Sequence, residues 1–297
     1  LVELGTPPVS AAFARAAASR PLRRVVIGGV DVSDPFGSAE LLVLGDGPDA
    51  ALRIAAALRP RPQIAGRGAA RDRVLGVALA AERVLGAHAS TAFGQGPALR
   101  AVVEALPDGA VVLVGNSGIV RALEAWAPGQ AAALEVHHQR GAAGIDGLVA
   151  GAVGARLATA DDRPVVGLLG DVAALHDLGA LAVAAALVRA PLVLVVVHNG
   201  GGRIFERLPI GRRSDLAAER ERLLVTPHDT SIARVATGLG VASCTVAERG
   251  PLVCAVTEAL ARLGPSVIEV RVDAAADAAV DAALAAAVEA AIAGALG

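Results

Sequence analysis

The segment 164–209 contains two short apolar runs that are separated by one helical stretch. The first run ends in Gly-Asp at 170–171, and the second, PLVLVVV, ends in His-Asn at 198–199 before three glycines. Residues 177–189, between them, have the apolar character of a helix that packs on a sheet. Two strands joined by a helix form a parallel βαβ unit, whose crossover is almost always right-handed. The segment therefore predicts an α/β fold with a parallel sheet.

Asp171 and Asn199 directly follow the two predicted strands. Because the carboxyl ends of parallel strands meet at one edge of the sheet, where α/β folds bind ligands, we expect both residues there. A carboxylate and an amide oxygen are hard ligands that suit Mg²⁺ or Ca²⁺. A helix cap and a loop amide would explain either residue alone. The pair, followed by glycines that let the backbone approach a ligand closely, favours a metal ion that holds a phosphate group.

The composition indicates a layered α/β protein. Hydrophobic residues make up 54% of the 297 residues and aromatic residues only 2%, so the core must consist of Ala, Val and Leu in layers. The net charge is −2 and the chain has no basic block, which argues against a nucleic-acid partner. The two cysteines, Cys244 and Cys254, lack CxxC spacing and fit core packing in a reducing cytosol.

The sequence predicts no membrane span and a cytoplasmic location. The first residues lack the charged-then-apolar pattern of a signal peptide. The apolar runs are too short, or too interrupted by charge, to cross a bilayer. The Ala-rich tail 274–297 is the nearest candidate, but Asp277, Asp281 and Glu289 make a surface helix the better interpretation.

Hydrophobic periodicity and turn residues divide the chain into three parts. Residues 1–87 form a partial α/β domain, in which 22–28 and 41–44 are predicted strands and 49–58 and 71–85 predicted helices. Residues 88–273 form one complete doubly wound domain, a parallel sheet with helices on both faces. Residues 274–297 form the C-terminal helix. Within the middle part we predict strands at 110–114, 134–137, 164–170, 191–197, 241–246 and 266–272, and helices at 96–105, 145–159, 177–189, 230–239 and 251–263.

Polar residues also close two other predicted strands of this domain. Arg121 lies four residues after Ser117, so a helix that begins there places both on one face. A hydroxyl and a guanidinium suit a carboxylate or a phosphate, with a surface salt bridge as the alternative. Arg140 lies where a strand gives way to a helix N-terminus, a position that attracts anions. The charged segment 211–222 fits a mobile lid and a solvated surface helix equally well.

The spacing of these motifs resembles that of thiamine-diphosphate-dependent enzymes, whose signature is Gly-Asp followed one βαβ unit later by Asn. More narrowly, the chain resembles the MenD family, 2-succinyl-5-enolpyruvyl-6-hydroxy-3-cyclohexene-1-carboxylate synthases of menaquinone biosynthesis. Four motifs carry this resemblance, which covers about residues 88–273. They are GNSxxxR at 115–121, RGAAGIDG at 140–147, GDxxxLHDL at 170–178 and GGxIFxxLP at 201–209.

The resemblance implies a site for thiamine diphosphate and Mg²⁺ (or Mn²⁺). The metal would be held by Asp171, the Asn199 side chain and a main-chain carbonyl near Gly201, and Ile145 would bend the cofactor into its V shape. The implied cofactor-binding set is completed by Asn116, Gly170 and Val172. Ser117, Arg121 and Arg140 would be catalytic residues that hold substrate carboxylates, and Phe205 and Leu208 would line the substrate cavity.

The implied reaction is decarboxylation of 2-oxoglutarate followed by addition to isochorismate. His198, Gly200 and Ala143 depart from the family pattern, which has Asn, Asn and Ser there. We find no counterpart of the family's N-terminal pyrimidine-binding domain. We therefore expect half an active site, completed by a pyrimidine-domain polypeptide or second subunit in a homo- or hetero-oligomer. Another thiamine-diphosphate-dependent 2-oxoacid decarboxylase or carboligase subunit, or a non-catalytic cofactor-binding partner, stays an alternative.

Overall fold

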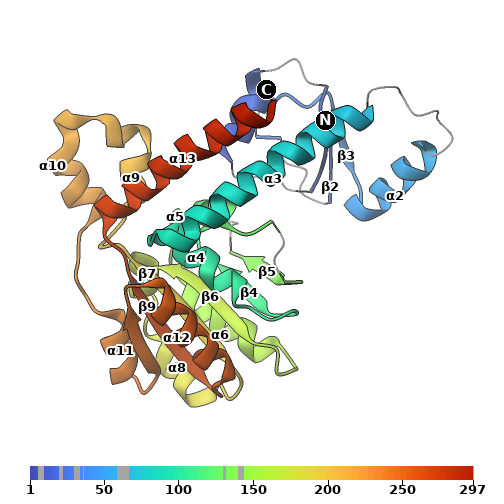
Figure 1. The fold of residues 1–297 in the computed structure, drawn as a ribbon. Helices are drawn as coiled ribbons and strands as arrows, with labels where there is room; N and C mark the ends of the chain where they lie inside the picture. Colours follow the sequence, from blue (N-terminus) through green and yellow to red (C-terminus); the bar gives the residue numbers. More distant parts are fainter. Residues whose placement is uncertain are drawn as a thin grey trace. The chain divides into compact units, whose positions relative to one another are not determined.

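The computed structural model of the chain describes residues 1–5, 10–19, 23–29, 34–35, 37–58, 67–129, 132–139 and 144–296. The chain forms two compact units, Leu1–Asp72 and Arg73–Gly297. Each unit has its own parallel sheet. Figure 1 shows the fold and labels most of the elements described below.

The first unit contains a three-stranded sheet in the order β1-β2-β3. Its strands are β1 (Val2–Leu4), β2 (Val25–Gly28) and β3 (Leu41–Leu44), and its helices are α1 (Ala11–Ser19) and α2 (Gly47–Leu58). Helix α3 (Arg67–Thr91) begins in this unit and continues into the second. The strands predicted at 22–28 and 41–44 are present as β2 and β3, the first of them only from Val25. β1 and α1 were not predicted; β1 has three residues, too few to show periodicity.

The second unit contains a six-stranded, wholly parallel sheet in the order β5-β4-β6-β7-β9-β8. Its two central strands β6 and β7 are buried along almost their whole length, as strands covered on both faces must be. The strands are β4 (Val111–Val114), β5 (Glu135–His138), β6 (Val165–Gly170), β7 (Leu192–His198), β8 (Ala242–Val246) and β9 (Pro265–Arg271).

Helices cover both faces of this sheet and form two separate apolar layers (Figure 1). One face packs against α4 (Gln95–Glu104), α5 (Gly118–Trp126) and α12 (Arg249–Ala261). The other packs against α6 (Leu148–Ala158), α7 (Asp171–Leu175), α8 (Ala180–Leu187) and α11 (Ile232–Gly238). Small side chains make up most of both layers, as the low aromatic content required. The predicted doubly wound fold is confirmed.

Several local predictions differ from the structure. The helix predicted from 145 begins at Leu148, because Gly147 adopts a left-handed backbone with φ 69° at its N-cap. The helix predicted at 177–189 is α8, Ala180–Leu187, and a further short helix, α7, precedes it directly after β6. The helix predicted at 230–239 is α11, which begins at Ile232 because Ser231 is its N-cap and accepts the Arg234 N–H with Oγ.

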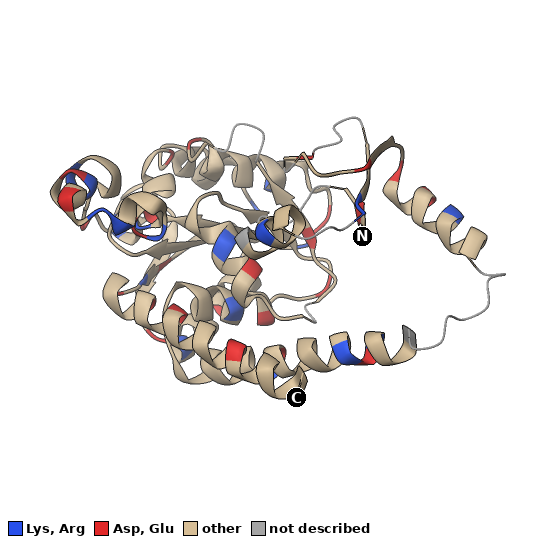
Figure 2. Cartoon of the chain, turned by 90° about the horizontal axis from the view of Figure 1, so that it is seen from above, with Lys and Arg blue, Asp and Glu red and all other residues tan. Residues whose placement is uncertain are grey.

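The segment after β7 folds as a series of short turns. It contains α9 (Ile204–Arg207), 3₁₀ turns at Pro209–Arg212 and Ser214–Leu216, α10 (Ala217–Arg220) and a π-helical turn at Glu221–Val225. The charged segment 211–222 is therefore not one continuous surface helix, which was one of its two predicted forms. Figure 2 shows acidic and basic residues close together along this part of the ribbon.

The C-terminal helix α13 (Ala274–Leu296) packs along part of α3. Leu284 is buried against Ala89 and Trp126, with Val84 and Leu85 beside them. Most of α13 is uncharged (Figure 2), and among the described residues it alone is long and apolar enough to cross a membrane. Only 6% of its most apolar 18-residue stretch is buried.

Candidate functional site

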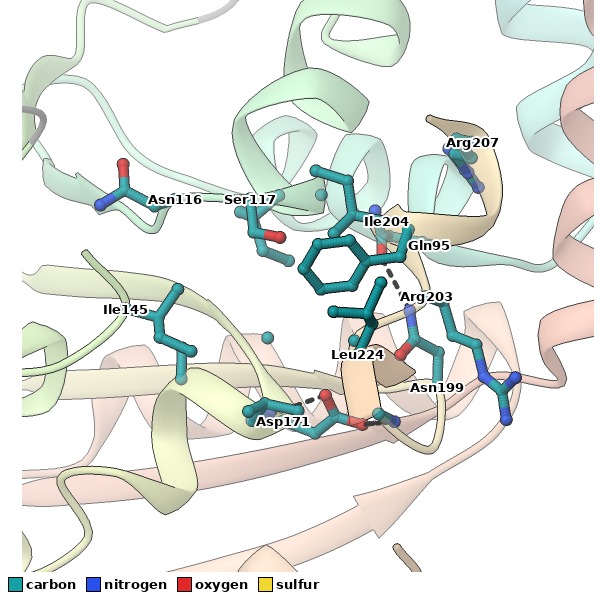
Figure 3. Close-up of a pocket in the computed structure, with 18 residues that line it drawn as sticks. Gln95, Asn116, Ser117, Ile145, Asp171, Asn199, Arg203, Ile204, Arg207 and Leu224 are labelled. Atoms are coloured by element: carbon teal, nitrogen blue, oxygen red, sulfur yellow. Dashed lines mark hydrogen bonds between the residues drawn. The ribbon is translucent and has the colours of Figure 1, made fainter. Parts of the chain in front are cut away.

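A pocket of about 190 Å³ lies at the carboxyl ends of β4, β6 and β7. The chain leaves β4 toward β5 on one side and returns to β6 on the other, so this is the switch point where open α/β sheets bind ligands. Figure 3 shows the pocket. Its lining residues are Gln95, Asn116, Ser117, Gly118, Ile119, Ile145, Gly170, Asp171, Val172, Ala173, Asn199, Gly201, Gly202, Arg203, Ile204, Phe205, Arg207 and Leu224.

Asp171 is the buried acid of the pocket, with a 2% exposed surface. Its Oδ1 accepts the N–H of Val172 at 2.7 Å, and its Oδ2 accepts the N–H groups of Gly200 and Gly201 at 2.9 Å each. These bonds fix the carboxylate at the ends of the neighbouring strands β6 and β7. A carboxylate oxygen has two lone pairs, so Oδ1 retains one for a cation.

A hydrogen bond from the side-chain nitrogen fixes the orientation of the Asn199 amide. Its Nδ2 donates to Oε1 of Gln95 at 3.2 Å, whereas its Oδ1 is buried and has no hydrogen-bond partner. Figure 3 shows that oxygen on the side of the amide that faces Asp171. A buried acceptor without a donor is unfavourable unless a ligand satisfies it. The Asn199 oxygen therefore fits a bound cation.

Gly201 and Gly202, which follow Asn199, lie too close to the neighbouring backbone to carry a side chain. Gly201 has φ 133°, and a Cβ there would lie 2.4 Å from the carbonyl oxygen of Val225. A Cβ on Gly202 would lie 2.8 Å from the Leu224 carbonyl oxygen. The Gly201 carbonyl accepts the N–H of Arg203 at 2.8 Å, which leaves it one further lone pair.

Two imidazoles lie beside the Asp171 carboxylate. His198 Nδ1 and His228 Nε2 are each 3.6 Å from its Oδ2, and their rings meet edge to face with centroids 4.8 Å apart. His198 Nε2 donates to the carbonyl of Thr230 at 3.1 Å. Burial lowers the pKa of His228, although the negative charge of Asp171 opposes this. The sequence predictions missed this contact because residue 228 is far from both strands in sequence.

Ser117 has a strained backbone, with φ 64° and ψ −123° at the N-cap of α5. Its side chain makes no capping hydrogen bond and belongs to the pocket lining (Figure 3). Arg121 is exposed and donates from Nη1 to the Ser117 carbonyl at 2.6 Å. The structure therefore brings these two residues together, but Arg121 does not line the pocket. Asn116 lines it and donates from Nδ2 to the Gly144 carbonyl.

The other residues expected at the site fall into three groups. Ile145, Gly170, Val172 and Phe205 line the pocket. Leu208 is 37% exposed and does not line it. Arg140 and Ala143 lie outside the described residues.

The structure also adds lining residues that the sequence did not suggest: Gln95, Arg203, Ile204, Arg207 and Leu224. Arg207 forms ion pairs with Asp277 at 2.9 Å and Asp281 at 2.7 Å, and Arg203 pairs with Glu206 and Glu221. Gln95 belongs to a Gly-Gln-Gly motif that matches no dinucleotide fingerprint, so no local signal identified it.

Comparison with known proteins identifies the family. Residues 125–270 match the family model for the C-terminal thiamine pyrophosphate-binding domain of thiamine pyrophosphate enzymes. Over 280 residues, 92% of this chain, the sequence is 42% identical to a 2-succinyl-5-enolpyruvyl-6-hydroxy-3-cyclohexene-1-carboxylate synthase of Sorangium cellulosum. The chain belongs to the MenD family of thiamine pyrophosphate enzymes. The matched region makes up 45% of that relative, so this MenD-family chain spans less than half of its length.

Two further relatives of the MenD-family chain have the same name. The synthase of Myxococcus xanthus is 41% identical over 206 residues, which is 66% of this chain and 33% of the relative. That of Pectobacterium carotovorum is 34% identical over 205 residues, which is 68% of this chain and 34% of the relative.

Solved structures share the fold. A thiamine diphosphate-dependent 4-hydroxybenzoylformate decarboxylase from Rhodococcus jostii RHA1 superposes with a TM-score of 0.59 at 20% identity, over 92% of this chain and 48% of the other. A putative thiamin diphosphate-dependent enzyme from Mycobacterium smegmatis gives 0.57 at 20% identity, over 91% and 47%. At this level of identity the likeness concerns the fold alone.

Proposed function

We propose that this chain provides the metal- and diphosphate-binding half of a 2-succinyl-5-enolpyruvyl-6-hydroxy-3-cyclohexene-1-carboxylate synthase. The reaction joins decarboxylated 2-oxoglutarate to isochorismate in menaquinone biosynthesis. The unpartnered Oδ1 of Asn199, buried in the pocket that holds the Asp171 carboxylate, is the observation that carries the proposal. The names of the relatives support the choice of reaction.

Asp171, Asn199 and the Gly201 carbonyl are the proposed ligands of Mg²⁺ or Mn²⁺. All three donors are oxygens, which is the ligand type that these cations prefer. The ion would neutralise the diphosphate of the cofactor close to the backbone that Gly201 and Gly202 keep free of side chains. When bound, thiamine pyrophosphate supplies the electron sink for decarboxylation of a 2-oxoacid. Ile145, which lines the pocket, would support the ring system of the bound cofactor.

Both proposed substrates carry carboxylates, and the site offers groups that bind them. The Ser117 hydroxyl lies in the pocket, and Arg121 donates to the Ser117 carbonyl. Arg140 stays a proposed substrate-binding residue on its sequence motif alone. Phe205, in the pocket lining, and Leu208, outside it, are the proposed apolar wall of the substrate cavity. A guanidinium binds a carboxylate with two parallel hydrogen bonds, which gives the arginines a physical reason to be there.

A pyrimidine-binding polypeptide, from a second gene or a second subunit, would complete the site in a homo- or hetero-oligomer. This part of the proposal follows from the resemblance to the MenD family, whose members have a pyrimidine-binding domain. The proposed location of the protein, as expected from the sequence, is the cytoplasm.

The test is an assay with 2-oxoglutarate, isochorismate, Mg²⁺ and thiamine pyrophosphate, with and without a pyrimidine-domain polypeptide. We expect synthase product only when both polypeptides are present. Robust turnover by the pure chain would refute the half-site proposal. Release of a simple aldehyde without isochorismate-dependent product would indicate a decarboxylase instead. Partner activity that is unchanged when Arg121 and Arg140 are replaced by alanine would indicate a non-catalytic binding subunit.

A further inference from the structure

The direction of the Asn199 amide is set by a residue outside the metal-binding loops. An asparagine can present either its oxygen or its nitrogen to a pocket, and only the oxygen binds a cation. Here Nδ2 donates to Gln95 Oε1 at 3.2 Å, which leaves Oδ1 free and buried. Gln95 itself is 5% exposed, so little solvent competes for this bond.

Gln95 is in turn held by the C-terminal helix. It is the first residue of α4, and the preceding N-cap, Gly94, has no side chain to cap the helix. The Gln95 backbone N–H instead donates to Oδ1 of Asp277 at 2.7 Å, across 182 residues of sequence. A Cβ on Gly94 would lie 2.5 Å from that oxygen, so the approach of Asp277 needs glycine there. The carboxylate of Asp277 therefore replaces the missing cap of α4.

A second acid on α13 serves as an internal comparison. Asp281 lies one helical turn after Asp277, and both pair with Arg207. Asp281 Oδ1 accepts the indole N–H of Trp126 at 3.0 Å, whereas Asp277 Oδ1 accepts the Gln95 N–H at 2.7 Å. Asp281 thus shares the docking contacts of α13 but does not hold Gln95.

We propose that Gln95 is a positioning residue for the metal site, which orients the Asn199 oxygen toward the cation, and that Asp277 of α13 holds Gln95 in place. The inference rests on the proposed function, because it presupposes a metal ion on Asp171 and Asn199. It assigns the C-terminal helix a part in cofactor binding without any contact between that helix and the cofactor. Residues that orient metal ligands in this way typically change metal affinity by about 10- to 100-fold when they are replaced.

The test measures Mn²⁺ binding by the full chain in the presence of thiamine pyrophosphate, from the electron paramagnetic resonance signal of free Mn²⁺. Gln95→Leu keeps the approximate size but removes the acceptor, and we expect about tenfold weaker Mn²⁺ binding. Gln95→Glu keeps an acceptor at the same place and should restore affinity to near the wild-type value. Asp277→Ala should also weaken binding about tenfold, whereas Asp281→Ala should leave it within about twofold.

Trp126 is the single tryptophan of the chain and reports whether α13 stays docked. Unchanged emission in Asp277→Ala, together with weaker Mn²⁺ binding, would support the positioning role. Wild-type affinity in Gln95→Leu, or equal losses in Asp277→Ala and Asp281→Ala, would overturn it. No Mn²⁺ binding by the wild-type protein would overturn the proposed function itself, which is a distinguishable result.

Discussion

Asp171, at the end of β6, accepts the backbone N–H of Gly201, after the end of β7, with its Oδ2 at 2.9 Å. This bond connects the acid and the glycine turn into one preformed structure, in which the Asp171 carboxylate is already directed before a ligand binds. Such preformed geometry lowers the cost of ordering on binding.

Replacement of the acid should remove the metal site. We expect Asp171→Ala to abolish Mg²⁺-dependent binding of thiamine pyrophosphate, because the two neutral oxygens that remain, of Asn199 and the Gly201 carbonyl, supply no negative charge to hold the cation. Isothermal titration calorimetry with and without Mg²⁺ measures this. Asp161→Ala is the matched control, since Asp161 is an exposed acid that precedes β6, at the opposite end of the strand, and pairs only with Arg163 among the ion pairs of the described residues. Binding by Asp171→Ala at unchanged affinity would contradict the assignment.

The glycine turn should not tolerate a side chain. Gly201→Ala would place a methyl group against the Val225 carbonyl at a φ of 133°, so we expect a loss of about 2 kcal/mol in the free energy of unfolding. Urea denaturation measures it. Gly154→Ala, in the middle of α6 with nothing within 4 Å of the new Cβ, should instead stabilise by about 0.5–1 kcal/mol. Equal effects at the two positions would show that the turn has room.

Replacement of Ile145 should weaken binding of the cofactor's ring system but not of its diphosphate. If it supports the ring system, Ile145→Ala should weaken the binding of thiamine pyrophosphate with Mg²⁺ but leave that of inorganic pyrophosphate with Mg²⁺ unchanged. Burial of an apolar side chain of this size contributes about 1.5–3 kcal/mol, so a loss of roughly tenfold or more is expected. Parallel losses for both ligands would place Ile145 at the diphosphate instead.

The Asp277 carboxyl should make the free energy of unfolding decrease as pH rises through its pKa. Burial, and secondarily the nearby charge of Asp281, raise the pKa of Asp277 above its ordinary 3.8, although the Gln95 N–H and Arg207 oppose the rise. The folded state then binds the proton more tightly than the unfolded state, so stability falls as pH rises from 3.8 through the raised value. Asparagine does not titrate.

Asp277→Asn should therefore become more stable relative to wild type as pH rises through this window, and the difference should then level off. Urea unfolding of both proteins over a pH series measures the difference, in which the other titrating groups cancel. A difference that is constant with pH, or that changes in the opposite direction, would show that the carboxylate is not disfavoured by folding.

The segment 209–225 should be protected by ligand binding. Its last residues contact the site, because Val225 accepts the N–H of Gly202 at 2.8 Å and Leu224 lines the pocket. If the segment acts as a lid, Mg²⁺ and thiamine pyrophosphate should slow tryptic cleavage at the exposed Arg212 and Arg213. Cleavage at an unchanged rate would favour a fixed surface segment.

The sequence predicts those parts of the site that follow long, uninterrupted strands. β6 and β7 are continuous apolar runs that end in polar residues, so the positions of Asp171 and Asn199 were predictable from the ends of the strands. Gln95 and Asp277 were not, because their contacts join residues 104 and 182 positions apart and leave no periodic pattern. Helical spacing placed Arg121 beside Ser117, but it could not show that the guanidinium binds the backbone carbonyl.

The backbone of Ser117 has a further consequence. Glycine would adopt its φ of 64° without steric cost, whereas a residue with a Cβ is typically destabilised there by about 1–3 kcal/mol. A screen of this chain for heat resistance alone should therefore select glycine at 117. The resulting protein would unfold at a higher temperature, but it would lack the single hydroxyl among the described residues that line the pocket. At position 117, thermal stability favours glycine, whereas the pocket needs the serine hydroxyl.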